Sequence, residues 1–175
     1  MIIPNSSDAT HKAWLYRLLS EIADKEKLGD LLRFKGGTCA AMQGYLDRFS
    51  VDLDFDLLDS KKNSLCSKLL EEVFLSLDLS IKDQSSNVPQ YFLRYPNKLK
   101  GRSVIKIDVT FPAPTTNEYE PIYFSDIAKT LQCQTVESMF SNKLVALIER
   151  YEKNGSIAGR DIFDINSFYQ KGVVY

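Results

Sequence analysis

Residues 51–57 alternate between apolar and acidic side chains without a break. The odd-numbered positions are Val51, Leu53, Phe55 and Leu57, and the even-numbered positions are Asp52, Asp54 and Asp56. Side chains of a β-strand point alternately to its two faces, so the pattern predicts a strand with one buried and one acidic face. Residues 103–111 alternate in the same way, with Lys106 and Asp108 on the polar face.

Patterns of apolar and small residues predict five helices. They cover residues 8–28, 38–45, 60–77, 135–153 and 160–170. Gly29 is expected to stop the first helix and Ser60 to cap the third. The expected buried faces are Ala13, Trp14, Leu18, Leu19 and Ile22 in the first helix, Leu65, Leu69, Val73 and Leu77 in the third, and Val136, Phe140, Leu144, Leu147, Ile148 and Tyr151 in the fourth.

Further strand-like segments lie at residues 31–34, 79–82 and 90–95, and residues 112–121 are expected to form a loop. This order predicts an α+β fold, with a small mixed or antiparallel sheet flanked by helices and followed by a C-terminal helical segment. We expect one compact unit, in which residues 1–134 form the core and residues 135–175 form a helical segment that completes the active site.

Size and charge are those of an ordinary soluble domain. The chain has 175 residues and a net charge of −1, so no overall positive field indicates nucleic acid. We find no signal peptide and no membrane span, and therefore expect a cytoplasmic protein with no membrane partner. Three widely spaced cysteines argue against structural zinc and disulfides and are expected to be reduced thiols.

The acidic face of residues 51–57 is the first candidate site. Carboxylates on one face of a strand are about 6.5–7 Å apart and repel one another. A fold tolerates them if the face is fully solvated or if a cation lies between them. Hard oxygen ligands indicate Mg²⁺ or Mn²⁺. Both interpretations, a solvated strand face and a metal site, stay open on these residues alone.

The pair Gly36-Gly37 follows a predicted strand, and Thr38 comes next. Two glycines allow the backbone to approach a ligand closely, and the amides at the start of a helix suit phosphate. Two glycines also simply make turns. A Gly-Gly-Thr turn that precedes an Asp-x-Asp strand is a more specific signal for a nucleotide site.

Residues 35–38 and 48–55, read together, resemble the first motif of the AbiEii/AbiGii toxin family. That family belongs to the DNA polymerase β-like nucleotidyltransferase superfamily, whose fold the resemblance therefore implies. Asp52 and Asp54 match its metal ligands. Arg48 could reach the phosphates or brace Asp52, and its two roles stay open. The resemblance implies that the nucleotide-binding residues of this motif are Gly36, Gly37, Thr38, Arg48 and Ser50.

Three later segments extend the resemblance over most of the chain. Asp108 matches the third carboxylate that ligates the metals, and Lys143 matches a lysine that contacts the nucleotide's phosphates. Asp161 and Asp164 match a closing motif, in which Asp161 is a catalytic candidate and Asp164 braces the site. Taken singly, each of these residues is also ordinary for a strand or helix surface. The lone histidine, His11, is expected to lie away from every motif and to be incidental.

The resemblance implies transfer of a nucleoside monophosphate from an NTP to an acceptor, with a tRNA 3′ end as one candidate, and a cognate antitoxin as a partner. Its biological setting would be a bacterial toxin–antitoxin or phage-defence system. The alternatives are a nucleotide-binding module that has lost transfer, a metal-dependent phosphohydrolase, and a structural α+β domain with an acidic surface.

Overall fold

The computed structural model describes residues 6–85, 88–96 and 102–175. Within them a mixed seven-stranded sheet has the order β3-β4-β5-β2-β1-β7-β6. The strands are β1 Leu32–Lys35, β2 Asp52–Leu57, β3 Ser80–Gln84, β4 Gln90–Arg94, β5 Val104–Thr110, β6 Tyr119–Phe124 and β7 Lys129–Gln134. The helices are α1 Ser6–Asp24, α2 Glu26–Leu31, α3 Gly36–Met42, α4 Asn63–Ser76, α5 Val136–Asn154 and α6 Gly159–Gln170. The predicted fold class is confirmed.

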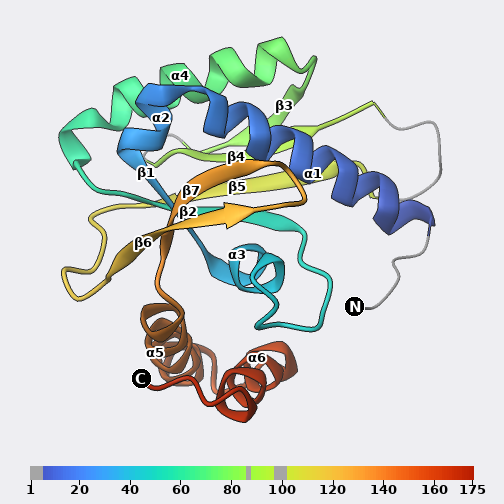
Figure 1. Ribbon diagram of the computed structural model, residues 1–175. Coiled ribbons are helices and arrows are strands. Elements are labelled where there is room, and N and C mark those ends of the chain that lie inside the picture. Colours follow the sequence, from blue (N-terminus) through green and yellow to red (C-terminus); the bar gives the residue numbers. More distant parts are fainter. Residues whose placement is uncertain (1–5, 86–87, 97–101) are drawn as a thin grey trace.

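The sheet separates two layers of helices (Figure 1). Helices α1, α2 and α4 cover one face, and α3, α5 and α6 lie on the other side. The apolar faces of β2 and β5 point toward the first layer, where Leu53, Phe55, Ile105 and Ile107 are each at most 1% exposed. The alternation predicted for these two strands therefore holds. Their polar residues face the layer that contains α3.

The hairpin of β6 and β7 was not predicted. Residues 119–121, expected in a loop, belong to β6, and residues 129–134 form β7. Strand β6 lies at the edge of the sheet, where Pro121 is tolerated because an edge strand leaves some N–H groups unpaired. Three of its six side chains are exposed and only Phe124 is buried, so it lacks the buried alternation that identified β2 and β5.

Several predicted helix ends are wrong. The segment expected as one helix over residues 8–28 is two helices, because α1 ends at Asp24, and Gly29 lies inside α2. A 3₁₀ turn at residues 60–62 precedes α4, and Asp59 caps that turn, not Ser60. Short polar side chains compete for caps, so neighbouring Asp and Ser residues are hard to rank from sequence.

The predicted buried faces of the helices are partly right. Leu18, Leu19 and Ile22 are buried in α1, whereas Ala13 is exposed. In α4 the buried residues are Cys66, Leu70, Val73 and Phe74, and Leu65 is 39% exposed. The apolar stripe of α4 is thus rotated relative to the prediction, because the sheet and α1 decide which side of the helix is covered.

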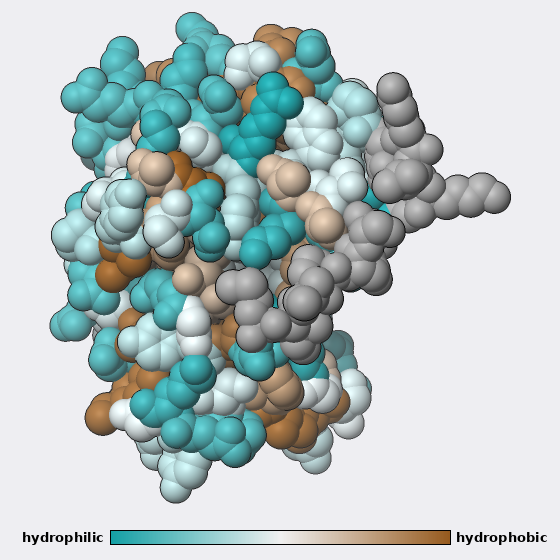
Figure 2. All heavy atoms as spheres, turned by 45° about the vertical axis from the view of Figure 1, so that its right-hand side comes forward, coloured by the Kyte–Doolittle hydropathy of each residue, from teal (hydrophilic) through white to brown (hydrophobic). Residues whose placement is uncertain are grey.

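Helices α5 and α6 expose apolar side chains. Ile148 and Tyr151, expected to be buried, are each 56% exposed, because α5 projects beyond the sheet below β6 and β7. Figure 2 shows apolar side chains at the lower end of the molecule, where these two helices lie. Within the described ranges, no helix combines the length and apolarity that crossing a bilayer requires.

Candidate active site

Strands β2 and β5 bring three predicted metal ligands onto one face of the sheet. The two strands are parallel neighbours, and Asp54 pairs in register with Asp108. Asp52 lies two residues before Asp54 and therefore shares its face. The register thus brings Asp108, which is more than fifty positions later in the sequence, onto the same face as Asp52 and Asp54. Neighbouring strands lie about 4.8 Å apart, so the pair 54/108 is brought close by the backbone itself.

The electrostatics of this cluster center on Asp54. Burial, followed by repulsion from Asp52 and Asp108, raises the pKa of Asp54 from its ordinary 3.8 to about 6. Lys106 and Lys35 offset part of this shift. A carboxylate with a raised pKa among like charges is stabilised by an added cation.

The turn at the start of α3 is fitted closely against Asp54. Gly36 has a φ of +79°, and a Cβ at this position would lie 2.4 Å from Asp54 Oδ2. A Cβ on Gly37 would lie 2.7 Å from Arg48 Nη2 and 3.0 Å from Ser50 Oγ. Gly36 is therefore required both by space and by its backbone conformation, whereas a side chain at Gly37 would have to displace the tip of Arg48. The turn joins the carboxylates to the predicted phosphate-binding residues.

Thr38 is used inside the protein. Its side-chain Oγ1 donates a hydrogen bond of 2.5 Å to the main-chain oxygen of Asp52, and the residue is 3% exposed. The bond fixes α3 to the beginning of β2. In this arrangement the hydroxyl proton holds the Asp52 backbone, whereas Ser50 Oγ lies against Gly37.

Arg48, Lys143 and Asp164 form a buried cluster that joins the loop before β2 to α5 and α6. Arg48 donates from Nε and Nη2 to the two oxygens of Asp164, at 2.5 and 2.7 Å. Lys143 Nζ lies 2.8 Å from Asp164 and 3.6 Å from Asp161. Asp161 also pairs with Arg150. Arg48 was expected either to reach the phosphates or to brace Asp52. In the structure its guanidinium braces a carboxylate, but that carboxylate belongs to Asp164.

The charge of Asp164 is held in place by this cluster. Burial alone would raise its pKa, but hydrogen bonds from Arg48 and Lys143 outweigh burial and hold the pKa below its ordinary value. Asp164 is 0% exposed and is thus a paired internal anion. Asp164 thus pairs with Arg48 and Lys143, the two cations that the sequence predicts to contact phosphate.

Asp56, the third aspartate of β2, is built into the fold. It is 0% exposed and accepts from Lys35 at 2.5 Å, Asn117 at 2.9 Å and Tyr119 at 2.9 Å. Asn117 in turn accepts from Asn142, the neighbour of Lys143 on α5. Sequence reasoning missed these partners, because Lys35, Asn117 and Tyr119 carry no pattern that identifies them. The network ties the carboxylate strand to the helix that bears Lys143.

His11 was expected to lie away from every motif, but it contacts Val51, which lies within the first motif. Its ring is 0% exposed, and its two nitrogens lie 3.0 Å from the Val51 carbonyl oxygen and 3.0 Å from the Tyr95 hydroxyl. Burial lowers the pKa of His11. The histidine thus anchors the residue that precedes Asp52. Only tertiary contact across the sheet end reveals this role.

The carboxylates fit a divalent cation by their chemistry. In the part of the chain that is described, no three acidic, histidine or cysteine side chains are gathered tightly enough to enclose an ion. Instead, Lys106 Nζ lies 2.5 Å from Asp108 Oδ2, and Gln90 Nε2 lies 3.2 Å from the same oxygen. An ammonium group thus supplies positive charge beside Asp108. Carboxylate oxygens are the hard ligands that Mg²⁺ or Mn²⁺ prefers, and such an ion would offset the repulsion that raises the pKa of Asp54.

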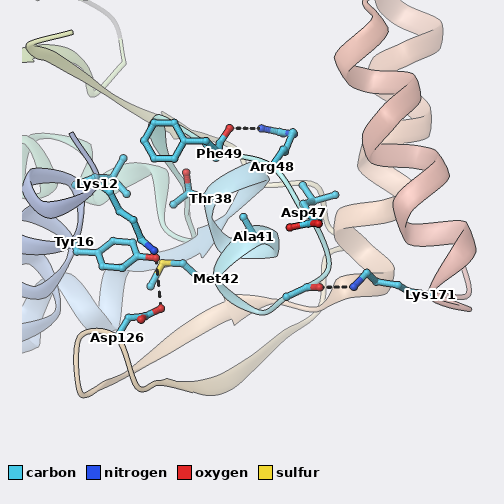
Figure 3. A pocket seen from close by; sticks show the side chains of 14 residues that line it. Lys12, Tyr16, Thr38, Ala41, Met42, Asp47, Arg48, Phe49, Asp126 and Lys171 are labelled. Atoms are coloured by element: carbon cyan, nitrogen blue, oxygen red, sulfur yellow. Dashed lines mark hydrogen bonds between the residues drawn. The ribbon is translucent and has the colours of Figure 1, made fainter. Parts of the chain in front are cut away.

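A cavity of about 390 Å³ is lined in part by the loop of residues 47–50, which precedes β2. Figure 3 shows Lys12 and Tyr16 of α1 facing Met42 of α3 across it. The Tyr16 hydroxyl lies 3.5 Å from Asp126 Oδ2, and Lys171 donates a hydrogen bond to the Gly44 oxygen. Thr38, Arg48 and Ser50 line it, but the carboxylates of β2 and β5 are not among its described lining residues. The cavity therefore adjoins the predicted phosphate-binding residues and is not lined by the predicted metal ligands.

Known structures share this fold. JHP933 from Helicobacter pylori superposes with a TM-score of 0.67 and 23% identity, over 96% of this chain and 68% of that one. MenT4, a nucleotidyltransferase toxin from Mycobacterium tuberculosis H37Rv, has a TM-score of 0.67 and 21% identity, over 94% of this chain and 59% of that one. The antibiotic-resistance factor ANT(2'')-Ia has a TM-score of 0.58 and 13% identity, over 94% of this chain and 86% of that one. The fold is that of the nucleotidyltransferases.

The sequence itself places the chain more narrowly. The family model described as nucleotidyl transferase AbiEii toxin, type IV toxin–antitoxin system, matches residues 17–174. The chain therefore belongs to the AbiEii nucleotidyltransferase toxin family, as its motifs predicted. Among curated proteins, no sequence matches it significantly.

Proposed function

We propose that this nucleotidyltransferase is metal-dependent and transfers a nucleoside monophosphate from an NTP to an acceptor hydroxyl. The proposal rests on one observation: Asp54 and Asp108 pair in register beside Asp52, with the Gly36 turn fitted against Asp54. A solvated acidic face would need neither the glycine nor a half-buried Asp54. A tRNA 3′ end is the first acceptor to test.

Asp52, Asp54 and Asp108 would hold the divalent ions, either Mg²⁺ or Mn²⁺. When bound, such ions supply Lewis-acid activation of the acceptor hydroxyl and neutralise charge on the triphosphate. The protein would fix the positions of these carboxylates, because β2 and β5 are central strands of the sheet. Rigid strands fix ligands more closely than loops do.

The chain's own groups would bind and orient the triphosphate. The Gly36 and Gly37 backbone, together with Ser50, lines the turn, and Lys143 supplies a flexible positive charge. Because Lys143 now pairs with Asp164, a phosphate would compete with that carboxylate for the ammonium group. Asp161 and Asp164 would then act by holding Lys143 and Arg48 in place, as positioning residues.

The transfer step itself is a substitution at the α-phosphorus. The acceptor oxygen forms a bond to that phosphorus while the bond to the oxygen bridging the β-phosphate breaks. Pyrophosphate leaves, and the hydroxyl proton passes to solvent. The protein contributes mainly alignment and charge stabilisation. Residues 135–175 would complete the site by bringing α5 and α6 against the loop at Arg48.

In its biological setting, the chain would act as the toxin of a pair and be neutralised by a cognate antitoxin. The family to which it belongs is a type IV toxin–antitoxin family. We assign no surface to the antitoxin.

Incubation of the protein with each labelled NTP, Mg²⁺ and total bacterial RNA tests the proposal. We expect label in one RNA class, released pyrophosphate, and loss of both with Asp108→Asn. Release of inorganic phosphate without labelled RNA would contradict transfer and support a phosphohydrolase. A denaturing gel together with thin-layer chromatography of the released phosphates distinguishes these outcomes.

A further inference from the structure

The loop before β6 joins strand β2 to helix α5 through one side chain, that of Asn117. Its Nδ2 donates a hydrogen bond of 2.9 Å to Asp56 Oδ2, and its Oδ1 accepts one of 2.9 Å from Asn142 Nδ2. An amide side chain has both donors and an acceptor, so it can serve two partners at once. Asp56 is a buried residue of the carboxylate strand, whereas Asn142 directly precedes Lys143 on α5. Asn117 therefore links the strand of the predicted metal ligands to the helix of the predicted phosphate-binding lysine.

The same loop holds α5 at a second point. The backbone N–H of Glu118 donates to Ser138 Oγ at 3.0 Å, and the backbone N–H of Thr135, the N-cap of α5, donates to the Glu118 oxygen at 2.9 Å. Ser138 and Asn142 are four residues apart, so they are neighbours on one face of the helix. Two attachments on one face fix the rotation of a helix about its own axis. Residues 117 and 118 therefore set the direction in which the other side chains of α5 point.

The rotation of α5 decides where Lys143 can reach. Successive residues of an α-helix are about 100° apart around its axis, so the direction of Lys143 follows from that of Asn142. Lys143 Nζ lies 2.8 Å from Asp164, which also binds Arg48. A lysine side chain has many rotamers, and a fixed backbone reduces the volume that its ammonium group can sample. Figure 1 shows α5 below the sheet, where it follows directly on β7. Its attachment to the loop before β6 therefore bears on the position of the lysine.

We propose that Asn117 is a positioning residue for nucleotide binding, which acts through Lys143 by fixing α5 against β2. The inference rests on the proposed function and goes further, because it assigns a role to a residue outside the proposed metal and phosphate contacts. Asp56 is a suitable anchor, since Lys35 and Tyr119 also donate to it and hold it in place. The competing explanation is that Asn117 only stabilises the fold.

A double-mutant cycle separates positioning from stability. Asn117→Leu removes both hydrogen bonds and keeps a side chain of similar volume, and Lys143→Ala removes the proposed phosphate contact. Calorimetry with NTP and Mg²⁺ is done at a temperature at which circular dichroism shows each variant folded. We expect Lys143→Ala to weaken NTP binding about 10–100-fold, as loss of a hydrogen bond to a charged group implies, and Asn117→Leu about 5–10-fold. In the Lys143→Ala background, Asn117→Leu should change NTP affinity less than about twofold, because two residues that act through one contact are not additive.

Asn142 provides the same test from the helix side. Asn142→Leu breaks the link to Asn117, so it should weaken NTP binding as Asn117→Leu does, and the combined variant should bind no more weakly than either alone. It replaces Asn117→Leu in the cycle if that variant does not fold. The matched control is Asn166→Leu, the same chemical change at an exposed position of α6, which should leave NTP affinity unchanged.

Amide hydrogen exchange tests the geometry without nucleotide. In Asn117→Leu and Asn142→Leu, the amides of α5 should exchange faster because the helix is released from the loop, whereas the amides of β2 should keep their protection. Equally increased exchange in α5 and β2 would indicate general destabilisation and contradict a positioning role.

The outcomes are distinguishable. An equal loss of NTP affinity on replacing Asn117 in the parent and in the Lys143→Ala background would overturn the proposal, because Asn117 would then not act through Lys143. Unchanged affinity in Asn117→Leu and Asn142→Leu would overturn it as well, and unfolding of both would show a structural role instead. Failure of the parent to bind NTP with Mg²⁺ would overturn the proposed function itself, while hydrogen exchange would still report whether Asn117 holds α5.

Discussion

At the scale of single residues, the β2 aspartates have different roles although their spacing in sequence is uniform. Asp56 is buried, accepts hydrogen bonds from three side chains and supports the fold. The pKa of Asp54, in contrast, is raised by burial and by like charges. The same residue type on the same strand face thus serves structure at one end and chemistry in the middle. The difference comes from which elements cover each position.

The raised pKa of Asp54 predicts a stability cost. The folded-state pKa of Asp54 is about 6, above the ordinary 3.8. The stability that Asp54 contributes to the fold is therefore fully present below pH 4 and is lost as the pH rises through 6. In metal-free protein at pH 7, Asp54→Asn should therefore raise the free energy of unfolding by about 1–3 kcal/mol. Urea denaturation at pH 5 and pH 7 measures it. A gain that is equal at both pH values, or a loss, would contradict this electrostatic origin.

Asp164 predicts the opposite sign. Its folded-state pKa lies below 3.8, so its stabilising contribution is present above that value and is lost as pH falls through the folded-state pKa. Asp164→Ala leaves Arg48 and Lys143 without their shared carboxylate and should cost about 3–5 kcal/mol at pH 7. Thermal or urea denaturation gives the value.

A matched control for this substitution is Asp24→Ala. Asp24 pairs with Lys129 on the surface, and such exposed pairs contribute about 0–1 kcal/mol. A comparable cost for both substitutions would show that the Asp164 cluster is not energetically special.

At the scale of elements, the turn between β1 and α3 is the most constrained junction of the site. Gly36→Ala places a Cβ against Asp54 and forces a side chain into a positive φ, so it should cost at least about 1–2 kcal/mol and weaken NTP binding. Gly29→Ala in α2 meets nothing within 4 Å and should stabilise the protein by about 0.5–1 kcal/mol. Urea denaturation and calorimetry of the two variants compare them. Similar behaviour of both would mean that the turn is not fitted to the site.

Strands β2 and β5 have strong local patterns and were predictable from sequence, whereas the β6–β7 hairpin was not. Strands β2 and β5 each bury one face, so alternation identified both strands and the side on which Asp52, Asp54 and Asp108 lie. Strand β6 buries only Phe124 at the sheet edge, and Pro121 indicated a loop, so the hairpin was missed. Alternation reports the burial of one face, and β6 has a single buried side chain.

At the scale of the whole molecule, the site is assembled from segments spread from His11 to Asp164. The motifs named most of the candidate residues in sequence, but their pairing depends on contacts across the fold. That Arg48 would meet Asp164, 116 positions later, could not be inferred from spacing. The same holds for His11 against Val51. Long-range partners are fixed by the packing of α1, α5 and α6, which sequence periodicity does not describe.

The central claim is that the carboxylates at positions 52, 54 and 108 bind a nucleoside triphosphate through a divalent ion. Isothermal titration of NTP with and without Mg²⁺, on the parent chain and on the variant carrying both Asp52→Asn and Asp54→Asn, tests it directly. We predict binding that requires Mg²⁺ and disappears in the double variant, while the melting temperature does not fall. Equal binding by the parent and the double variant would contradict the account.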